Sequence, residues 1–345
     1  MGALLFIVLR FYSPAMSSAT SSPEASRTHS GMLGLPLRVG TRGSPLALVQ
    51  TRAFLEQIMA VCPVLRGLDA FREYAIATTG DAIQNRPLSE IGGKGLFARE
   101  IHEALLDGRI DFAVHSLKDL ETELPAGVVL ACTLRREDAR DVLILPQGGA
   151  DPKNPFASLP QGALVGSASL RRQAQLLALR PDLRVETIRG NVQTRLSKVR
   201  SGAFAGSLLA LAGLKRLGLE AEAAVILAPE IMLPAACQGI VGVTVRARDA
   251  ELHELLSAVE DPEARAVSRA ERALLAALDG NCRTPIGGYA RILPNGRLRL
   301  DGLTARADGS FILRRAIEGE AQDAVALGEA LGDELRADSP ADVFA

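Results

Sequence analysis

The hydrophobic pattern of this chain has two alternating forms. From residue 37 onward, short apolar runs that suit buried strands alternate with longer stretches in which apolar residues recur every three to four positions. This alternation predicts an α/β fold, with helices packed on a mostly parallel sheet. A predicted strand at 37–41 is followed directly by Ser44 and Pro45, which supply an N-cap and a first-turn proline for a helix over about 45–61.

The predicted elements fall into two similar lobes. The first lobe gains strands at 71–78, 111–115, 128–133 and 142–145, with a helix over about 96–106. Residues 148–162 are rich in Pro, Gly and Asn, which predicts a crossing into a second lobe. The second lobe repeats the scheme with a strand at 164–166, a helix at 170–179, a strand at 185–189 and a helix after Asn191.

The pattern changes after about residue 261. Pro262 opens a long predicted helix to about residue 278, and Asp308-Gly309 predicts a hairpin turn between strands at 297–307 and 311–318. With a last helix over about 321–335, this region is expected to form a small α+β domain. Because two α/β lobes around a cleft also describe bilobed solute-binding proteins, the architecture alone leaves the function open.

Composition and charge narrow the choice. The 345 residues are 48% hydrophobic, which is enough for more than one core. The 39 Lys and Arg nearly balance the 40 Asp and Glu, so we expect neither a nucleic-acid partner nor a membrane anchor. The four cysteines and four histidines are scattered, which argues against disulfides and a metal centre and favours a reducing, cytoplasmic location.

The first 35 residues differ from the rest. A short apolar run at 3–9 precedes a Ser-rich stretch at 17–30. The run is too short to span a bilayer, and no basic residue precedes it as a signal peptide would require. We expect residues 1–35 to be a disordered extension or to reflect a start codon assigned too far upstream, with Met16 and Met32 as alternatives.

Cationic residues concentrate in the second predicted lobe. Arg171 and Arg172 begin a predicted helix, Arg189 ends a strand and Arg195 lies one turn into the next helix. Such positions lie at the carboxyl ends of strands, where α/β sheets bind ligands, and guanidinium groups bind carboxylates or phosphates in two-pronged fashion. The lobe therefore suits a polyanionic small molecule. A solvated basic face is the alternative, and nucleic acid is disfavoured because only 4% of the chain is aromatic.

Three further places could carry chemistry. Lys94 lies in a glycine-rich segment, which either binds an anion through backbone N–H groups or forms a simple turn. Lys118 and Asp119 follow an apolar strand, so Asp119 is either an ordinary ion-pair partner or a negative group in a positive cleft. Cys282, next to Arg283, is either a nucleophile or a small buried apolar residue.

Taken together, these segments resemble the hydroxymethylbilane synthases, also called porphobilinogen deaminases. The resemblance follows the chain in order from about residue 37 to 335 and rests on eight motifs. They are TRGSPLA (41–47), GGKGLF (92–97), AVHSLKD (113–119), SLRRQ (169–173), RGNVQTRL (189–196), AGLKRLG (212–218), LPAACQG (233–239) and CRTPIG (282–287).

The resemblance implies an enzyme of three domains. Domain 1 (36–134 with 240–258) and domain 2 (140–235) would be α/β lobes like those of periplasmic binding proteins, and domain 3 (262–345) a small α+β unit. The family condenses four porphobilinogen molecules, with loss of ammonia, into hydroxymethylbilane for haem, chlorophyll or corrinoid synthesis. The resemblance further implies a cytoplasmic monomer and allows hand-off of the product to uroporphyrinogen-III synthase.

The resemblance also assigns roles to residues. Cys282 would hold the dipyrromethane cofactor in a thioether, which a non-catalytic binding protein would not need. Asp119 would bind pyrrole N–H groups and stabilise the cationic azafulvene formed as ammonia leaves. Asp81 is a weaker candidate nearby, whereas Thr79, Glu90 and Asn281 depart from the common pattern. The implied binders of cofactor and substrate are Arg42, Ser44, Lys94, Ser116, Lys118, Ser169, Arg171, Arg172, Arg189, Arg195, Arg216, Gln238 and Arg246.

Overall fold

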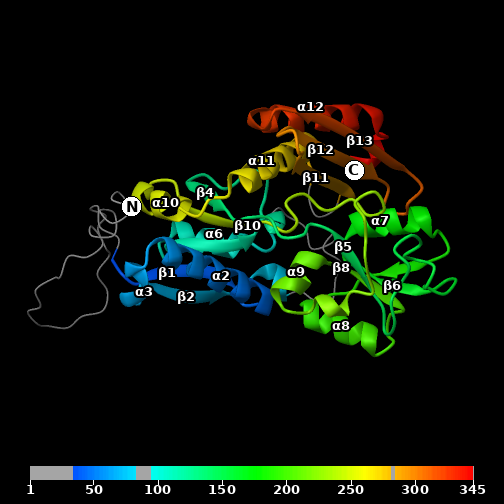
Figure 1. Cartoon of the computed structure of the whole chain (residues 1–345), viewed down its shortest axis with the longest axis horizontal. Helices are drawn as coiled ribbons and strands as arrows, with labels where there is room; N and C mark the ends of the chain where they lie inside the picture. The colour runs from blue at the N-terminus through cyan, green and yellow to red at the C-terminus, as the bar shows by residue number, and fades with distance from the viewer. Residues whose placement is uncertain (1–33, 83–94, 281–283, 345) are drawn as a thin grey trace, which may run out of the picture.

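A computed structural model of the chain describes residues 34–82, 95–280 and 284–344. Lys94, Glu90, Asn281 and Cys282 therefore lie outside the described residues, as does nearly all of the predicted extension. Figure 1 shows two α/β lobes side by side, with a smaller unit of helices and strands above them. The predicted class, two α/β lobes with a small C-terminal α+β unit, is confirmed. No helix within the described ranges is long and apolar enough to cross a membrane.

Lobe 1 is built on a five-stranded sheet with the order β2-β1-β3-β10-β4. β1 (Leu37–Arg42) pairs in parallel with β2 (Phe71–Ile76) and β3 (Phe112–Ser116). β10 (Val241–Arg246) lies antiparallel between β3 and β4 (Val128–Thr133). The helices of this lobe are α2 (Pro45–Val61), α3 (Val64–Gly67), α4 (Thr79–Ala82), α6 (Arg99–Leu106), the 3-10 turn η1 (Leu117–Asp119) and α10 (Ala250–Ser257).

Lobe 2 has a second five-stranded sheet, with the order β7-β6-β8-β5-β9. β6 (Leu164–Gly166) pairs in parallel with β7 (Arg184–Glu186) and β8 (Gly206–Ala210). β5 (Asp141–Ile144) runs antiparallel to both β8 and β9 (Val225–Ile226). The helices are α7 (Leu170–Leu179), α8 (Val192–Arg200), α9 (Leu211–Arg216) and the turn η2 (Glu220–Glu222).

The placement of β5 corrects one prediction. The hydrophobic pattern assigned a strand at 142–145 to the first lobe, but its residues pair with β8 and β9 in the sheet of lobe 2. The chain therefore crosses between the lobes over 134–140, before the segment at 148–162. All four residues of β5 are buried, and a run of buried residues does not by itself tell which sheet it joins.

The C-terminal unit packs two helices against a three-stranded antiparallel sheet. The predicted hairpin turn at Asp308-Gly309 is confirmed, and Gly309 has a φ of +77°. A Cβ at Gly309 would lie 2.5 Å from the backbone nitrogen of Ala178 in α7, so the turn packs closely on lobe 2. The elements are α11 (Pro262–Ala277), β11 (Ile286–Ile292), β12 (Leu298–Ala305), β13 (Ile312–Gly319), the turn η3 (Ala321–Asp323), α12 (Ala324–Asp338) and the turn η4 (Ala341–Phe344).

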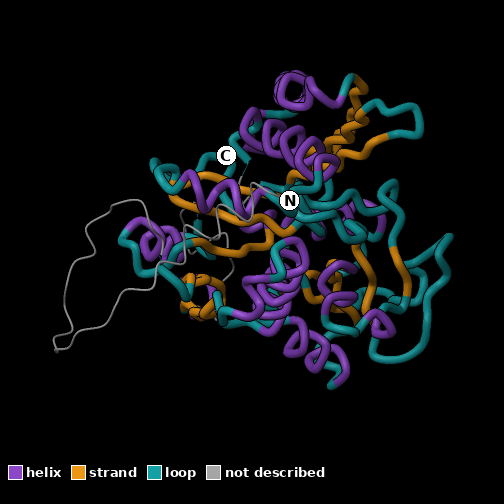
Figure 2. The backbone as a smooth tube through the Cα atoms, turned by 60° about the vertical axis from the view of Figure 1, so that its left-hand side comes forward, coloured by secondary structure: helices purple, strands orange, loops and turns teal. Residues whose placement is uncertain are grey.

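The chain passes between the two lobes twice, first from β4 to β5 and then from β9 to β10. Figure 2 shows the three groups of strands in separate parts of the molecule, each with helices beside it. The carboxyl ends of β1 and β3 in lobe 1, and of β6 in lobe 2, lead into the segments that face the space between the lobes. This is the edge of the sheets at which α/β proteins bind ligands.

Candidate active site

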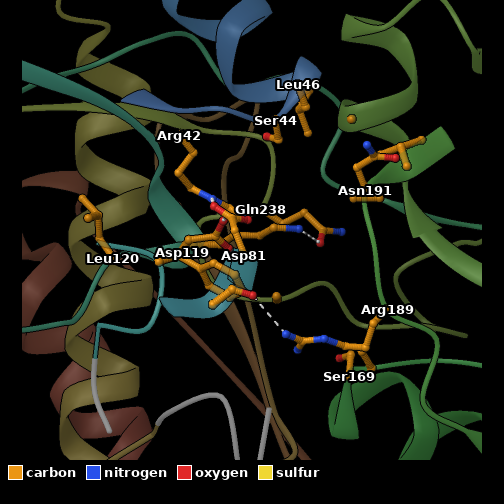
Figure 3. A pocket seen from close by; sticks show the side chains of 18 of the residues that line it. Arg42, Ser44, Leu46, Asp81, Asp119, Leu120, Ser169, Arg189, Asn191 and Gln238 are labelled. Carbon is orange, nitrogen blue, oxygen red and sulfur yellow. Dashed lines mark hydrogen bonds and ion pairs between the residues drawn. The ribbon is translucent and has the colours of Figure 1, made fainter. Parts of the chain in front are cut away.

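A cavity of about 830 Å³, the interlobe pocket, lies where three helices begin. Ser44 caps α2, Ser169 caps α7 and Asn191 caps α8, each side chain accepting a hydrogen bond from a backbone N–H in the first turn. All three caps line the pocket (Figure 3). Because the start of a helix carries a partial positive charge and unpaired N–H groups, the arrangement favours an anionic ligand.

Charged side chains line both sides of this pocket. Among the described lining residues, six are cationic and three are acidic. An excess of cations in a concave site attracts anions and concentrates them there. The cations are Arg42, Lys118, Arg171, Arg172, Arg189 and Arg195, and the acids are Asp81, Asp119 and Glu121.

Arg42 organises the acidic side of the pocket. Its Nη2 lies 2.5 Å from Oδ1 of Asp81, and its Nη1 lies 3.2 Å from Oδ2 of Asp119. The guanidinium also stacks on the ring of Phe97, at 4.2 Å from the ring centre. Burial raises the pKa of Asp81, but Arg42, with smaller contributions from neighbouring groups, outweighs burial and holds that pKa below its usual value. Arg42 thus keeps two carboxylates together on the lobe 1 side, as Figure 3 shows.

Arg189 and Arg195 come from the opposite lobe. Arg189 is 7% exposed and donates from Nη2 to the backbone oxygen of Gly80 in lobe 1, at 3.1 Å. Arg195 donates from Nε to the backbone oxygen of Gly190. Burial lowers the pKa of Arg195 to about 10, and the neighbouring Arg172 and Arg189 add to the effect. Cations that repel one another in this way are stabilised when an anion binds between them.

Arg171 and Arg172 share one buried carboxylate. Asp141 is fully buried at the start of β5, and its two oxygens lie 2.8 Å from Arg171 Nη2 and 2.7 Å from Arg172 Nη2. The Nε atoms of both arginines are buried and have no hydrogen-bond partner among the described residues. Two guanidinium groups on one carboxylate leave one net positive charge, and buried donors without partners are costly unless a ligand or water meets them.

Comparison with known proteins identifies the family. A family model described as "Porphobilinogen deaminase, dipyromethane cofactor binding domain" matches residues 37–254, and "Porphobilinogen deaminase, C-terminal domain" matches residues 265–337. The chain belongs to the porphobilinogen deaminase family. The porphobilinogen deaminase of Paracoccus denitrificans is 50% identical to this chain, over 90% of this chain and 96% of that protein.

Other members of the porphobilinogen deaminase family are nearly as similar. The protein of that name from Nitrobacter winogradskyi is 48% identical over 86% of this chain and 92% of its own length. The chloroplastic porphobilinogen deaminase of Oryza sativa is 45% identical over 87% of this chain and 83% of its own. Among solved structures, the periplasmic molybdate-binding protein of Azotobacter vinelandii covers 68% of the chain at 14% identity with a TM-score of 0.34, from which nothing about function follows.

Most of the residues implied by the resemblance to porphobilinogen deaminases meet in the pocket. The implied residues that line the pocket are Arg42, Ser44, Lys118, Asp119, Ser169, Arg171, Arg172, Arg189, Arg195 and Gln238, together with the weaker candidate Asp81. Cys282 and Lys94 lie outside the described residues, but their neighbours Gly95, Gly280 and Thr284 line the pocket. A site with partnerless arginine donors and excess positive charge fits a dipyrromethane that carries several carboxylates.

Three of the implied binders are not among the described residues that line the pocket. Ser116 donates to Gln50 Oε1, and Arg216 donates to the backbone oxygen of Gly239. Arg246 is 4% exposed and pairs with Asp249 and Asp111. Because β10 runs antiparallel to β3, its last residue lies at the edge of the sheet opposite the carboxyl ends of β1 and β3. The structure thus places Arg246 within the fold of lobe 1, away from the interlobe pocket.

Two acidic residues in or behind the pocket wall were not predicted from the sequence. Asp141 does not line the pocket but pairs with Arg171 and Arg172, which do. It directly precedes the predicted strand at 142–145, and an acid at the start of a buried strand is the signal that could have revealed it. Glu121 lines the pocket, and its Oε2 lies 4.0 Å from Nδ1 of the buried His102. Both ring nitrogens of His102 lack a hydrogen-bond partner among the described residues. The sequence offered no signal for this pair, because residues 102 and 121 are joined only by the fold.

Proposed function

We propose that this chain condenses four porphobilinogen molecules, with release of ammonia at each condensation, on a dipyrromethane carried by Cys282. Water then cleaves the tetrapyrrole from the dipyrromethane and supplies the hydroxyl group of hydroxymethylbilane. The observation that carries the proposal is one pocket in which Asp119 lies among cations from both lobes. Its supply of positive charge suits the acetate and propionate groups of each pyrrole. The product would serve the synthesis of haem, chlorophyll or corrinoids.

The cationic residues would bind the carboxylates of cofactor, substrate and growing chain. Arg171 and Arg172 present buried guanidinium groups from the first turn of α7, and Ser169 fixes that turn by capping it. Arg189 and Arg195 approach from the segment around α8. Guanidinium groups bind carboxylates with two parallel hydrogen bonds and stay charged throughout the working pH range, so they hold orientation as well as charge.

Asp119 would act on the reacting pyrrole. Its carboxylate lines the pocket with 27% of the side chain exposed, and Arg42 holds it in place. A fixed carboxylate can accept a hydrogen bond from a pyrrole N–H and stabilise the positive charge that develops as ammonia leaves. When bound, dipyrromethane supplies the pyrrole carbon to which the first substrate unit is joined. Arg42 and Asp81 would then act on Asp119, by fixing its position.

Cys282 would attach the cofactor. Support comes from its described neighbours, since Gly280 and Thr284 both line the pocket that holds Asp119. Thioether formation requires a sulfur nucleophile, and the described cysteines Cys62, Cys132 and Cys237 are all buried. Burial raises the pKa of Cys132 and of Cys237 to about 12, which makes both poor nucleophiles.

Four expectations from the family resemblance stay predictions. They are the domain boundaries (36–134 with 240–258, 140–235 and 262–345), a monomeric state, a cytoplasmic location, and hand-off of the product to uroporphyrinogen-III synthase. Gel filtration with light scattering would measure whether the protein is a monomer. Co-purification with uroporphyrinogen-III synthase would test the hand-off.

Two measurements on purified protein test the proposed function. The wild type should consume porphobilinogen and release ammonia, and its intact mass should exceed the sequence mass by a covalent dipyrromethane. Cys282→Ser should lose the added mass, whereas the control Cys62→Ser should keep it. The alternative is a binding protein. It is indicated if the wild type, purified from cells able to make the cofactor, shows no added mass and binds porphobilinogen without consuming it.

A further inference from the structure

The buried carboxylate Asp141 is connected to more than the two arginines. Gln238, which is also fully buried, donates from Nε2 to Asp141 Oδ1 at 2.8 Å and to the backbone oxygen of Ala139 at 2.7 Å. Its Oε1 accepts a hydrogen bond from Lys118 Nζ at 3.3 Å. Both N–H donors and the oxygen of the amide are therefore engaged by the protein, which fixes the orientation of the amide.

These contacts join parts of the chain that lie far apart in sequence. Lys118 belongs to η1 in lobe 1, beside Asp119, while Asp141 begins β5 in lobe 2. Gln238 lies in the segment that returns the chain from lobe 2 to lobe 1. We infer that Asp141 and Gln238 form an internal polar bridge between the lobes, and that this bridge positions Lys118, Arg171 and Arg172 for binding of the substrate's carboxylates. The inference rests on the proposed function.

The chemistry of the bridge explains why its members suit this role. A buried carboxylate between two arginines fixes both guanidinium groups before any ligand arrives, so less ordering is needed on binding. The attraction of Arg171 and Arg172 outweighs the effect of burial on Asp141 and holds its pKa below the usual range, so the carboxylate stays charged. Because Gln238 is neutral, its hydrogen bond can hold the Lys118 ammonium group in place without cancelling the positive charge of that group.

Lys118 offers a direct readout of the bridge. Burial among the walls of the pocket lowers the pKa of Lys118 to about 8; Arg172 and Arg171 add to this, and Asp119 and Asp141 oppose it. Solvent within the pocket reaches the exposed parts of this side chain and weakens the effect. The hydrogen bond from Nζ to Gln238 favours the charged form, so changes at residue 238 should move the pKa in a defined direction.

The chain contains a matched control for Asp141. Asp111 is 5% exposed and lies directly before β3, and its carboxylate pairs with two arginines, Arg38 at 2.8 Å and Arg246 at 3.4 Å. None of these three residues lines the pocket. Asp111→Asn and Asp141→Asn each remove a buried charge between two arginines, so both should lower stability. Only Asp141→Asn should also displace side chains that line the pocket.

The test combines two readouts on the full chain. In the first, turnover of porphobilinogen is measured well below the melting temperature and corrected for the folded, cofactor-loaded fraction. Asp141→Asn should lower kcat/KM at least 10-fold, and Asp111→Asn should stay within about twofold of the wild type. Equal losses in the two variants would show that Asp141 acts only through stability and would overturn the inference.

In the second readout, the pKa of Lys118 is measured from the pH dependence of its acetylation, with the exposed Lys153 as an internal reference. Gln238→Leu removes the acceptor and should lower this pKa, whereas Gln238→Glu adds a negative charge and should raise it, each by roughly half a unit or more. The same pKa in all three proteins would refute the bridge. If the wild type does not consume porphobilinogen, the proposed function fails, while these profiles still decide the bridge.

Discussion

Arg42 donates a hydrogen bond to Asp119, with 3.2 Å between Nη1 and Oδ2. The same guanidinium makes two hydrogen bonds to Asp81 and stacks on Phe97, so two carboxylates and a ring hold it in place. A carboxylate held by such a rigid group has a fixed place when substrate enters. This matters because electrostatic stabilisation depends on charges that do not have to reorganise during the reaction.

The first prediction concerns the charge of Asp119. Asp119→Asn keeps the shape and an acceptor but removes the charge, so turnover should fall about 100-fold or more, by analogy with loss of one preorganised group. Asp119→Glu keeps the charge and should retain measurable activity. Rates should be compared for cofactor-loaded protein, which intact mass identifies. Near-normal turnover of the asparagine variant would show that Asp119 is only an ion-pair partner of Arg42.

The second prediction concerns the geometry of Arg42. Lysine keeps the charge but cannot bind two carboxylates and a ring at once, so Arg42→Lys should lower kcat roughly 10- to 100-fold, as expected for losing hydrogen bonds to charged groups. The matched control is Arg52→Lys, on the same lobe, where an exposed arginine pairs with Glu73. Its kcat should stay within about twofold of the wild type. Similar losses in both variants would rule out a special role for Arg42.

The third prediction concerns the arginines of lobe 2. Arg189→Lys and Arg195→Lys should each raise KM for porphobilinogen about 10-fold, because a two-pronged contact with a carboxylate is lost while the charge is kept. Partly elongated chains should also accumulate on the enzyme and be visible by intact mass. Arg306→Lys, at an exposed ion pair with Asp342, serves as the control. If the lobe 2 variants elongate like the wild type, these arginines form only a solvated face.

The fourth prediction concerns stability at acid pH. Burial lowers the pKa of His115 to about 3, with His102 and Arg42 adding to the effect, while its Nε2 contacts Thr244 Oγ1 at 2.9 Å. In the unfolded chain this histidine takes up a proton below about pH 6.5. The folded state should therefore lose stability as the pH falls from about 6.5 toward 3, and His115 should not contribute to pH dependence above that window.

Urea unfolding between pH 7 and pH 4.5 measures this effect. His115→Gln should reduce the slope of unfolding free energy against pH, even if the variant is less stable overall. The buried His102 also has a lowered pKa, because burial outweighs the opposing charge of Glu121, so some slope should persist in the His115 variant. An unchanged slope in that variant would contradict the assignment.

Local features of the fold could be predicted from the sequence, whereas strand placement could not. Ser44-Pro45 marked a helix start, and the turn at Asp308-Gly309 marked a hairpin, because caps and turns depend on neighbouring residues. The sheet that β5 joins depends on partners more than 60 residues later, and a single buried run does not encode them. The same limit kept the order of strands in both lobes out of reach.

The candidate site shows the same division. The family resemblance implies both Arg189 and Arg246 as binders, yet among the described residues only Arg189 lines the pocket. The difference is the direction of β10, which runs antiparallel to β3 and carries Arg246 to the far edge of the sheet. The family resemblance supplied most of the charged residues that line the pocket, but it did not supply Asp141 or the contacts that its carboxylate makes.

The position of β10 also sets the order in which the lobes can form during synthesis. Lobe 2 takes its five strands from one continuous stretch, from Asp141 to Ile226, and can complete its sheet once that stretch has left the ribosome. Lobe 1 must wait for residues 241–246, because β10 is the strand that joins β4 to β3. Of the two lobes, lobe 1 therefore completes its sheet second, although it comes first in the chain. Until β10 is made, β3 and β4 lack the strand that lies between them, and this lasts while the whole of lobe 2 is translated.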